Sequence, residues 1–110
     1  MKAEKSTSQV LQEARALVAA GWTQGPYYRK SGDQDCYCAM GAVYAVMGQL
    51  TGYRYPIGHA GANDALDQAA TRLMGTDWRM GSAIAYNEEA GRTQADVLRL
   101  FDVALELASK

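Results

Sequence analysis

The sequence predicts an all-α fold, a single compact domain of four to five helices. Two stretches near the ends of the chain, 6–21 and 94–108, repeat apolar residues at the spacing of an amphipathic helix. Alternating apolar and polar runs long enough for strands of a sheet are absent from the sequence. A length of 110 residues with 48% hydrophobic residues fits one domain with one core, here 1–110.

The first helix follows a polar segment, 1–6. Ser6 or Thr7 is the expected N-cap, and Gln9 stands where the third residue of a capping box belongs. Gly21 is the expected stop after the apolar face. A loop with Gly-Pro and Ser-Gly pairs comes next.

The second helix is expected to start near Asp35 and to run to about Met47. The segment 48–63 is rich in glycine and tyrosine, and it is expected to be a loop with room for a small hairpin. Asn63 or Asp64 should then cap the third helix.

The third helix should end at Gly75, and a short fourth helix is expected from Asp77 to about Tyr86. Thr93, followed by Asp96, is typical of a capped start for the last helix. Apolar residues cover more than half of that helix, so it should be central in the fold or shared with a second copy of the chain through 94–108.

Charge and hydropathy argue against two classes of partner, duplex nucleic acid and membranes. A net charge of −1 and a pI near 5.7, without a basic stripe, argue against binding of duplex nucleic acid. No run approaches the length of a membrane helix and no charged-then-apolar leader opens the chain, so a cytoplasmic protein without a membrane association is expected.

Both cysteines lie at the expected start of the second helix. Cys36 and Cys38 are two residues apart, which is unfavourable for a mutual disulfide, so we expect reduced thiols. Cys38 shares a helical face with Gly41 and Ala42, and small residues of this kind let another helix approach closely. On this interpretation Cys38 only packs.

The alternative is a cysteine-dependent hydrolase or transferase. Cys38, with Cys36 as the substitute, would be the nucleophile, and His59 would be its base. Asn87 would orient His59, in the chain order of papain-like enzymes. "QDCYCAMGA" locally resembles their nucleophile helix, but the sequence offers no strands for their sheet.

A metal site is not expected. The two cysteines and His59 supply three donors, whereas a closed zinc site needs four. We also expect no cofactor.

Aromatic and basic residues gather in two predicted loops, and they suit a planar anionic ligand or a protein interface. The candidate ligand-binding residues are Trp22, Tyr27, Tyr28, Arg29, Tyr53, Arg54, Tyr55 and Arg92. A wet cap over a small core would explain the tyrosines equally well.

Two motifs resemble a family of small uncharacterised bacterial and phage proteins. "YCAMGA" at 37–42 is similar to that family's aromatic-Cys-Ala-x-Gly-Ala helix start. "AYNEEAGRT" at 85–93 is similar to its aromatic-Asn-acidic turn and Gly-Arg-Thr. The chain departs from the family by Tyr86 for Trp, Glu88 for Asp and Ala90 for Pro.

The resemblance implies a helical fold without a known activity. It selects Cys38 over Cys36 and adds Asn87 and Arg92 as residues of interest. We therefore expect a small binding domain that takes a small anionic or nucleotide-like ligand, or a protein partner, through its aromatic-basic loops. A phage protein that sequesters a ligand would fit, and a structural subunit that self-associates is the third hypothesis.

Overall fold

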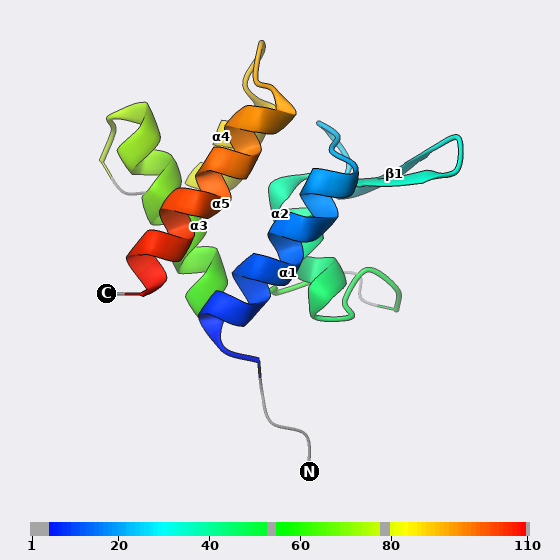
Figure 1. Cartoon of the computed structure of the whole chain (residues 1–110), viewed down its shortest axis with the longest axis horizontal. Helices are drawn as coiled ribbons and strands as arrows, with labels where there is room; N and C mark the ends of the chain where they lie inside the picture. Colours follow the sequence, from blue (N-terminus) through cyan, green and yellow to red (C-terminus); the bar gives the residue numbers. More distant parts are fainter. Residues whose placement is uncertain (1–4, 53–54, 78–79, 110) are drawn as a thin grey trace.

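Five helices and one two-stranded antiparallel sheet make up the part of the chain that the computed structural model describes, residues 5–52, 55–77 and 80–109. The elements in order are α1 (Thr7–Ala20), β1 (Tyr28–Ser31), β2 (Gln34–Tyr37), α2 (Ala39–Val46), α3 (Ala60–Met74), α4 (Ser82–Glu88) and α5 (Gln94–Ala108). The hairpin projects away from the helices (Figure 1).

Helix α5 lies alongside both α1 and α3 (Figure 1). Its side chains Leu100 and Phe101 are fully buried between these two neighbours and belong to the core of the molecule. The breadth of its apolar face therefore follows from having a helix on either side. Its exposed residues recur at helical spacing: Ala95, Arg99, Asp102 and Glu106.

Three helix ends confirm the predictions from capping residues. Ser6 Oγ accepts a hydrogen bond of 3.1 Å from the Gln9 amide at the start of α1. Thr93 and Asp96 form a complete capping box before α5, and the bonds that Thr93 donates hold the pKa of Asp96 below its usual value. Helix α3 ends at Gly75, which has φ of +69°.

The predicted start of the second helix was wrong. Asp35 lies in β2, and α2 begins after Cys38, which is its N-cap. The hairpin forms at 28–37 and not in the segment 48–63, where the described residues contain no strand. Its two-residue loop has a positive φ at Gly32, +61°, which is the geometry that a turn of type II′ requires.

Two further helix starts differ from the predictions. Helix α3 begins one turn earlier than expected, because His59 Nδ1 accepts from the Ala62 amide at 3.1 Å. Helix α4 begins at Ser82 rather than at Asp77 and extends to Glu88. Its first amides bond to Asp67 of α3, a partner that local sequence does not reveal.

None of the helices in the described ranges is both long enough and apolar enough to cross a membrane.

Candidate functional site

Asn87 is buried in α4, with 1% of its surface exposed, and its amide is fully bonded. Its Oδ1 accepts from Trp22 Nε1 at 2.9 Å and from the Ala39 amide at 3.0 Å. Its Nδ2 donates to the Thr23 carbonyl at 3.3 Å and to Glu88 Oε2 at 2.7 Å. Asn87 thus joins the loop before the hairpin to the start of α2.

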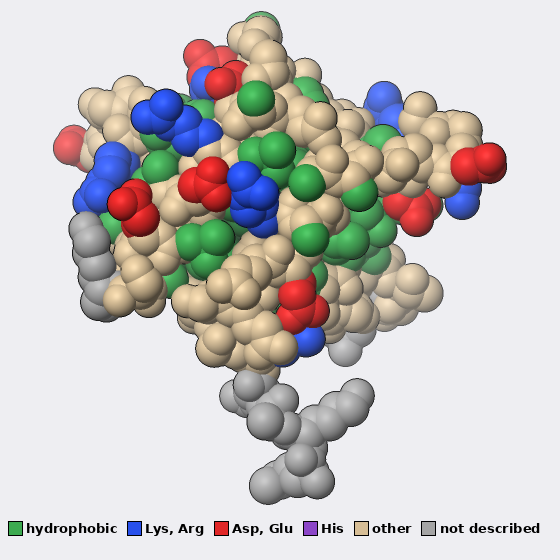
Figure 2. Space-filling view, in the orientation of Figure 1, with side chains coloured by type: hydrophobic (Ala, Val, Ile, Leu, Met, Phe, Trp, Pro, Cys, Tyr) green, Lys and Arg blue, Asp and Glu red, His purple; other side chains and the backbone are tan. Residues whose placement is uncertain are grey.

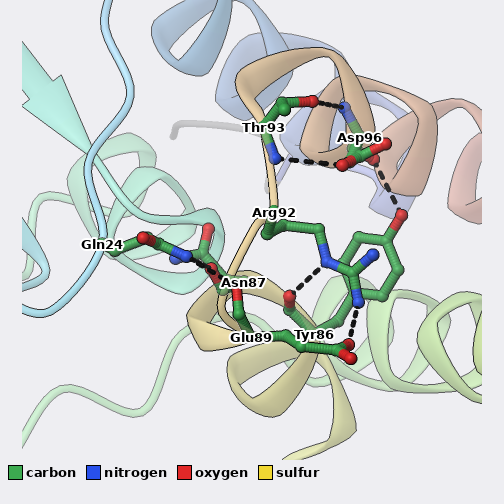
Figure 3. Close-up of polar contacts among 7 residues, drawn as sticks. All are labelled: Gln24, Tyr86, Asn87, Glu89, Arg92, Thr93 and Asp96. Carbon is green, nitrogen blue, oxygen red and sulfur yellow. Dashed lines mark hydrogen bonds and ion pairs between the residues drawn. The ribbon is translucent and has the colours of Figure 1, made fainter.

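Arg92 holds the turn that follows α4 (Figure 3). Its Nε donates to the Tyr86 carbonyl at 2.7 Å, its guanidinium lies 3.7 Å from the centre of the Tyr86 ring, and it forms an ion pair with Glu89. Tyr86 in turn donates its hydroxyl to the Asp96 carbonyl at 3.1 Å. Gln24 reaches the same turn and donates to the carbonyls of Asn87 and Glu89 (Figure 3).

Cys38 and His59 each cap a different helix. The Cys38 thiol is 5% exposed and its Sγ accepts from the Gly41 amide at 3.2 Å. Burial raises the pKa of this thiol, so it is protonated near neutral pH. Because His59 Nδ1 accepts from an amide, its Nε2 carries the proton and donates to the Lys5 carbonyl at 3.3 Å.

These contacts bring Asn87, but not His59, to the start of α2. Asn87 bonds the amide next to Cys38, whereas both nitrogens of His59 are bonded to backbone groups elsewhere. Cys36 is also buried, at 8% exposure. Among the described residues no group of three or more His, Cys, Asp and Glu side chains could hold a metal ion.

A groove lined by aromatic side chains lies between the hairpin and the end of α2. Its volume is about 650 Å³, and we call it the tyrosine groove; its lining residues are Tyr27, Tyr28, Asp35, Tyr37, Ala45, Gly48, Leu50 and Thr51. Tyr27 and Tyr28 are 43% and 40% exposed. The groove therefore presents aromatic rings to solvent.

Ring contacts fix the tyrosines of the groove. Tyr27 meets Tyr44 edge to face with 4.9 Å between ring centres, and Tyr28 lies 5.4 Å from Tyr37 across the hairpin. The backbone of Tyr27 also lies against α2, because a Cβ on Gly41 would stand 1.9 Å from the Tyr27 carbonyl oxygen. A glycine is thus required at that position.

Asp35 is the charged residue of the groove lining. Its Oδ1 accepts from the Tyr28 hydroxyl at 2.7 Å and lies 3.8 Å from Lys30 Nζ. The hydrogen bond to Asp35 raises the pKa of Tyr28, so the hydroxyl stays neutral and donates. Burial raises the pKa of Tyr44 to about 12.

The structure separates the predicted ligand-binding residues. Tyr27 and Tyr28 line the groove, whereas Trp22 and Arg92 belong to the polar contacts around α4. Arg29 alternates with Tyr28 along β1 and so lies on the opposite face of the hairpin. Tyr55 is 78% exposed outside the groove lining.

Tyr53 and Arg54, also predicted, lie outside the described residues. Sequence reasoning missed Asp35, Tyr37 and Leu50 as parts of the groove. The signal that could have indicated the first two is the Ser-Gly-Asp turn, which pairs Tyr28 with Tyr37 and Lys30 with Asp35.

Comparison with known proteins identifies a protein family that matches the chain. A family model covering residues 2–107 describes a family of unknown function (DUF6197). No curated protein and no solved structure matches the chain.

Proposed function

Because the chain belongs to the DUF6197 family of unknown function, its surface is the guide to its role, and we propose that it is a small binding domain whose binding site is the tyrosine groove. The observation that carries the proposal is the groove itself, whose volume of about 650 Å³ lies in the range of ligand sites. Partly exposed tyrosines are also enriched at protein interfaces.

The lining of the groove favours an apolar or aromatic group as its occupant. Three tyrosines and Leu50 line it, and the charged residue among the described lining is the acidic Asp35. An anion placed inside the groove would meet that carboxylate. We therefore propose a protein partner that inserts an apolar side chain, and we place any negative charge of the partner outside the groove.

A nucleotide-like ligand is the second candidate, as expected for a sequestering protein. A planar base could stack on the exposed Tyr28 ring, but not between Tyr28 and Tyr37, because those two rings, with centres 5.4 Å apart, already contact each other. Lys30, beside Asp35 at the margin of the groove, is the cation that would meet a phosphate. If the ligand is nucleotide-like, its phosphate group should increase its affinity for the protein.

Titration of the isotopically labelled protein by NMR tests both candidates. N-acetylphenylalanine amide should shift the signals of Tyr27, Tyr28 and Leu50, and Tyr28→Ala should weaken binding at least five-fold. Ile84→Ala is the matched control, because Ile84 is exposed to 43% on α4, away from the groove. Equal affinities of the two variants, or shifts confined to other surfaces, would overturn the proposal.

Adenosine and adenosine monophosphate separate the candidates in the same experiment. The protein-partner proposal expects both to bind weakly and equally. Binding of the monophosphate at least ten-fold more tightly than adenosine, with loss of that difference in Lys30→Ala, would establish the nucleotide-like ligand instead.

A further inference from the structure

The two edges of the hairpin are not equivalent. The Tyr37 amide donates to the Gly21 carbonyl at 3.0 Å, and the Tyr37 carbonyl accepts from the Thr23 amide at 3.1 Å. The outer edge of β2 is therefore covered by the segment that follows α1. Since Tyr37 pairs with Tyr28, the backbone groups of Tyr28 point to the opposite edge.

Among the residues that the structure describes, no backbone group bonds to the outer edge of β1. The Cys38 amide donates to the Tyr27 carbonyl at 3.2 Å, so Tyr27 and Cys38 are a hydrogen-bonded pair. In an antiparallel hairpin, hydrogen-bonded and non-hydrogen-bonded pairs alternate. The next residue, Tyr28, and then Lys30 therefore direct their N–H and C=O groups outward, away from β2. All four residues of β1 are exposed. In the described part of the chain, Tyr28 and Lys30 make no backbone bond outside the hairpin.

The side chains of β1 give this edge a chemical preference. Tyr28 and Lys30 lie on the face of the groove, and Arg29 lies on the other face. None of the ion pairs among the described residues involves Arg29. Figure 2 shows that charged side chains lie on the projecting hairpin.

The charge of Arg29 disfavours pairing of β1 with a second copy. In an antiparallel pairing of two β1 strands about a two-fold axis at Arg29, the two Arg29 side chains would lie opposite each other on one face, and like charges across strands are destabilising. The same charge attracts an acidic strand, whereas Lys30 lies on the other face beside Asp35. Charge complementarity therefore favours a partner over a second copy of the chain.

We propose that an extended acidic segment of a protein partner adds to β1 as a third strand. Its backbone would bond to the outward amides and carbonyls of Tyr28 and Lys30, as in other cases of strand addition. Alternate side chains would enter the tyrosine groove, and the acidic ones between them would face Arg29. The inference rests on the proposed function and names the class of partner.

A synthetic octapeptide in which glutamate alternates with valine, blocked at both ends, is the probe, and its lysine-for-glutamate analogue is the control. The glutamate peptide should bind at least ten-fold more tightly. It should also slow hydrogen exchange of the Tyr28 and Lys30 amides at least ten-fold. Arg29→Glu should reverse the preference between the two peptides. This test of the charge preference does not depend on the stability of the proline variant described next.

The comparison of Lys30→Pro with Lys30→Ala isolates the backbone bond. Both variants lose the charge, but only proline removes the outward N–H, and proline is tolerated on an edge strand. Lys30→Pro should bind the glutamate peptide at least ten-fold more weakly than Lys30→Ala. The signals of α2 and α5 report whether each variant is folded.

Three outcomes overturn strand addition. In the first, Lys30→Pro and Lys30→Ala bind equally. In the second, N-acetylphenylalanine amide binds the groove but neither octapeptide changes the exchange of the β1 amides, so the proposed function stands alone. In the third, these amides become protected as protein concentration rises without peptide, and a second copy is the occupant.

Discussion

At the scale of single residues, Asn87 shows how a candidate catalytic or binding residue acquires a structural role. An amide in a sequence motif invites a functional interpretation, yet its oxygen and nitrogen are both bonded inside the molecule. The Trp22 ring can only donate, so the amide oxygen must face it. Burial at 1% exposure makes every one of these bonds costly to lose.

Asn87→Ala should therefore lower the free energy of unfolding by about 2–4 kcal/mol, because it leaves the Trp22 and Ala39 N–H groups without an acceptor. Urea unfolding measures the loss. Glu89→Ala is the control, since Glu89 is exposed and its side chain pairs with Arg92 at the surface. The control should change stability by less than about 1 kcal/mol. Equal losses in both variants would contradict the role given to Asn87.

At the scale of elements, two helices begin where a side chain from a distant part of the chain accepts hydrogen bonds from backbone amides at the helix start. Asp67 of α3 accepts from the Gly81 amide at 3.1 Å and from the Ala83 amide at 2.8 Å at the start of α4. Asn87 of α4 likewise bonds the first amide of α2. Local sequence misplaced the start of α4 because Asp67 is far away in the chain, and it misplaced the start of α2 because Asp35 lies in β2 and the N-cap is Cys38, which is not a typical capping residue.

Glycine substitutions in α2 and after α3 should have unequal effects. Alanine at position 41 would place its Cβ 1.9 Å from the Tyr27 carbonyl oxygen, so Gly41→Ala should separate the hairpin from α2 and cost more than about 2 kcal/mol. At Gly75, nothing lies near the new Cβ and φ is +69°, so Gly75→Ala should cost about 1 kcal/mol.

The two glycine variants can be separated by hydrogen exchange as well as by unfolding. Gly41→Ala should speed exchange of the Cys38 amide, which donates to Tyr27, whereas Gly75→Ala should leave it unchanged. Helix propensity alone would make Gly41→Ala stabilising by about 1 kcal/mol. A stabilised Gly41→Ala protein would therefore refute the close approach of the hairpin.

At the scale of the whole molecule, apolar periodicity identified α1 and α5, which carry their own caps and much of the core. The tyrosine groove could be predicted only as two tyrosines in a loop. Asp35 and Tyr37 enter it through the register of the hairpin, and Leu50 enters it through the packing of α2 against that hairpin. Such a site depends on tertiary contacts that no local pattern encodes.

The buried thiol of Cys38 and the buried phenol of Tyr44 should make the stability of the fold decrease at alkaline pH. Burial raises the pKa of Cys38 above 9.0 and that of Tyr44 from 10.0 to about 12. A group whose pKa is raised by folding stabilises the fold below its unfolded pKa, and that contribution is lost as the pH rises through the folded value. Stability should thus decline from about pH 9 upward, first through Cys38 and then, between pH 10 and 12, through Tyr44.

Urea unfolding from pH 7 to pH 11.5 should show this decline, with roughly 1 to 2 kcal/mol attributable to Tyr44. Cys38→Ser should flatten the curve just above pH 9, and Tyr44→Phe should flatten it above pH 10. Parallel curves for all three proteins would contradict the assignment. Rapid alkylation of native Cys38 at pH 6, slowed by His59→Ala, would contradict the raised pKa of the thiol and favour the enzyme hypothesis, because a cysteine nucleophile must ionise near neutral pH.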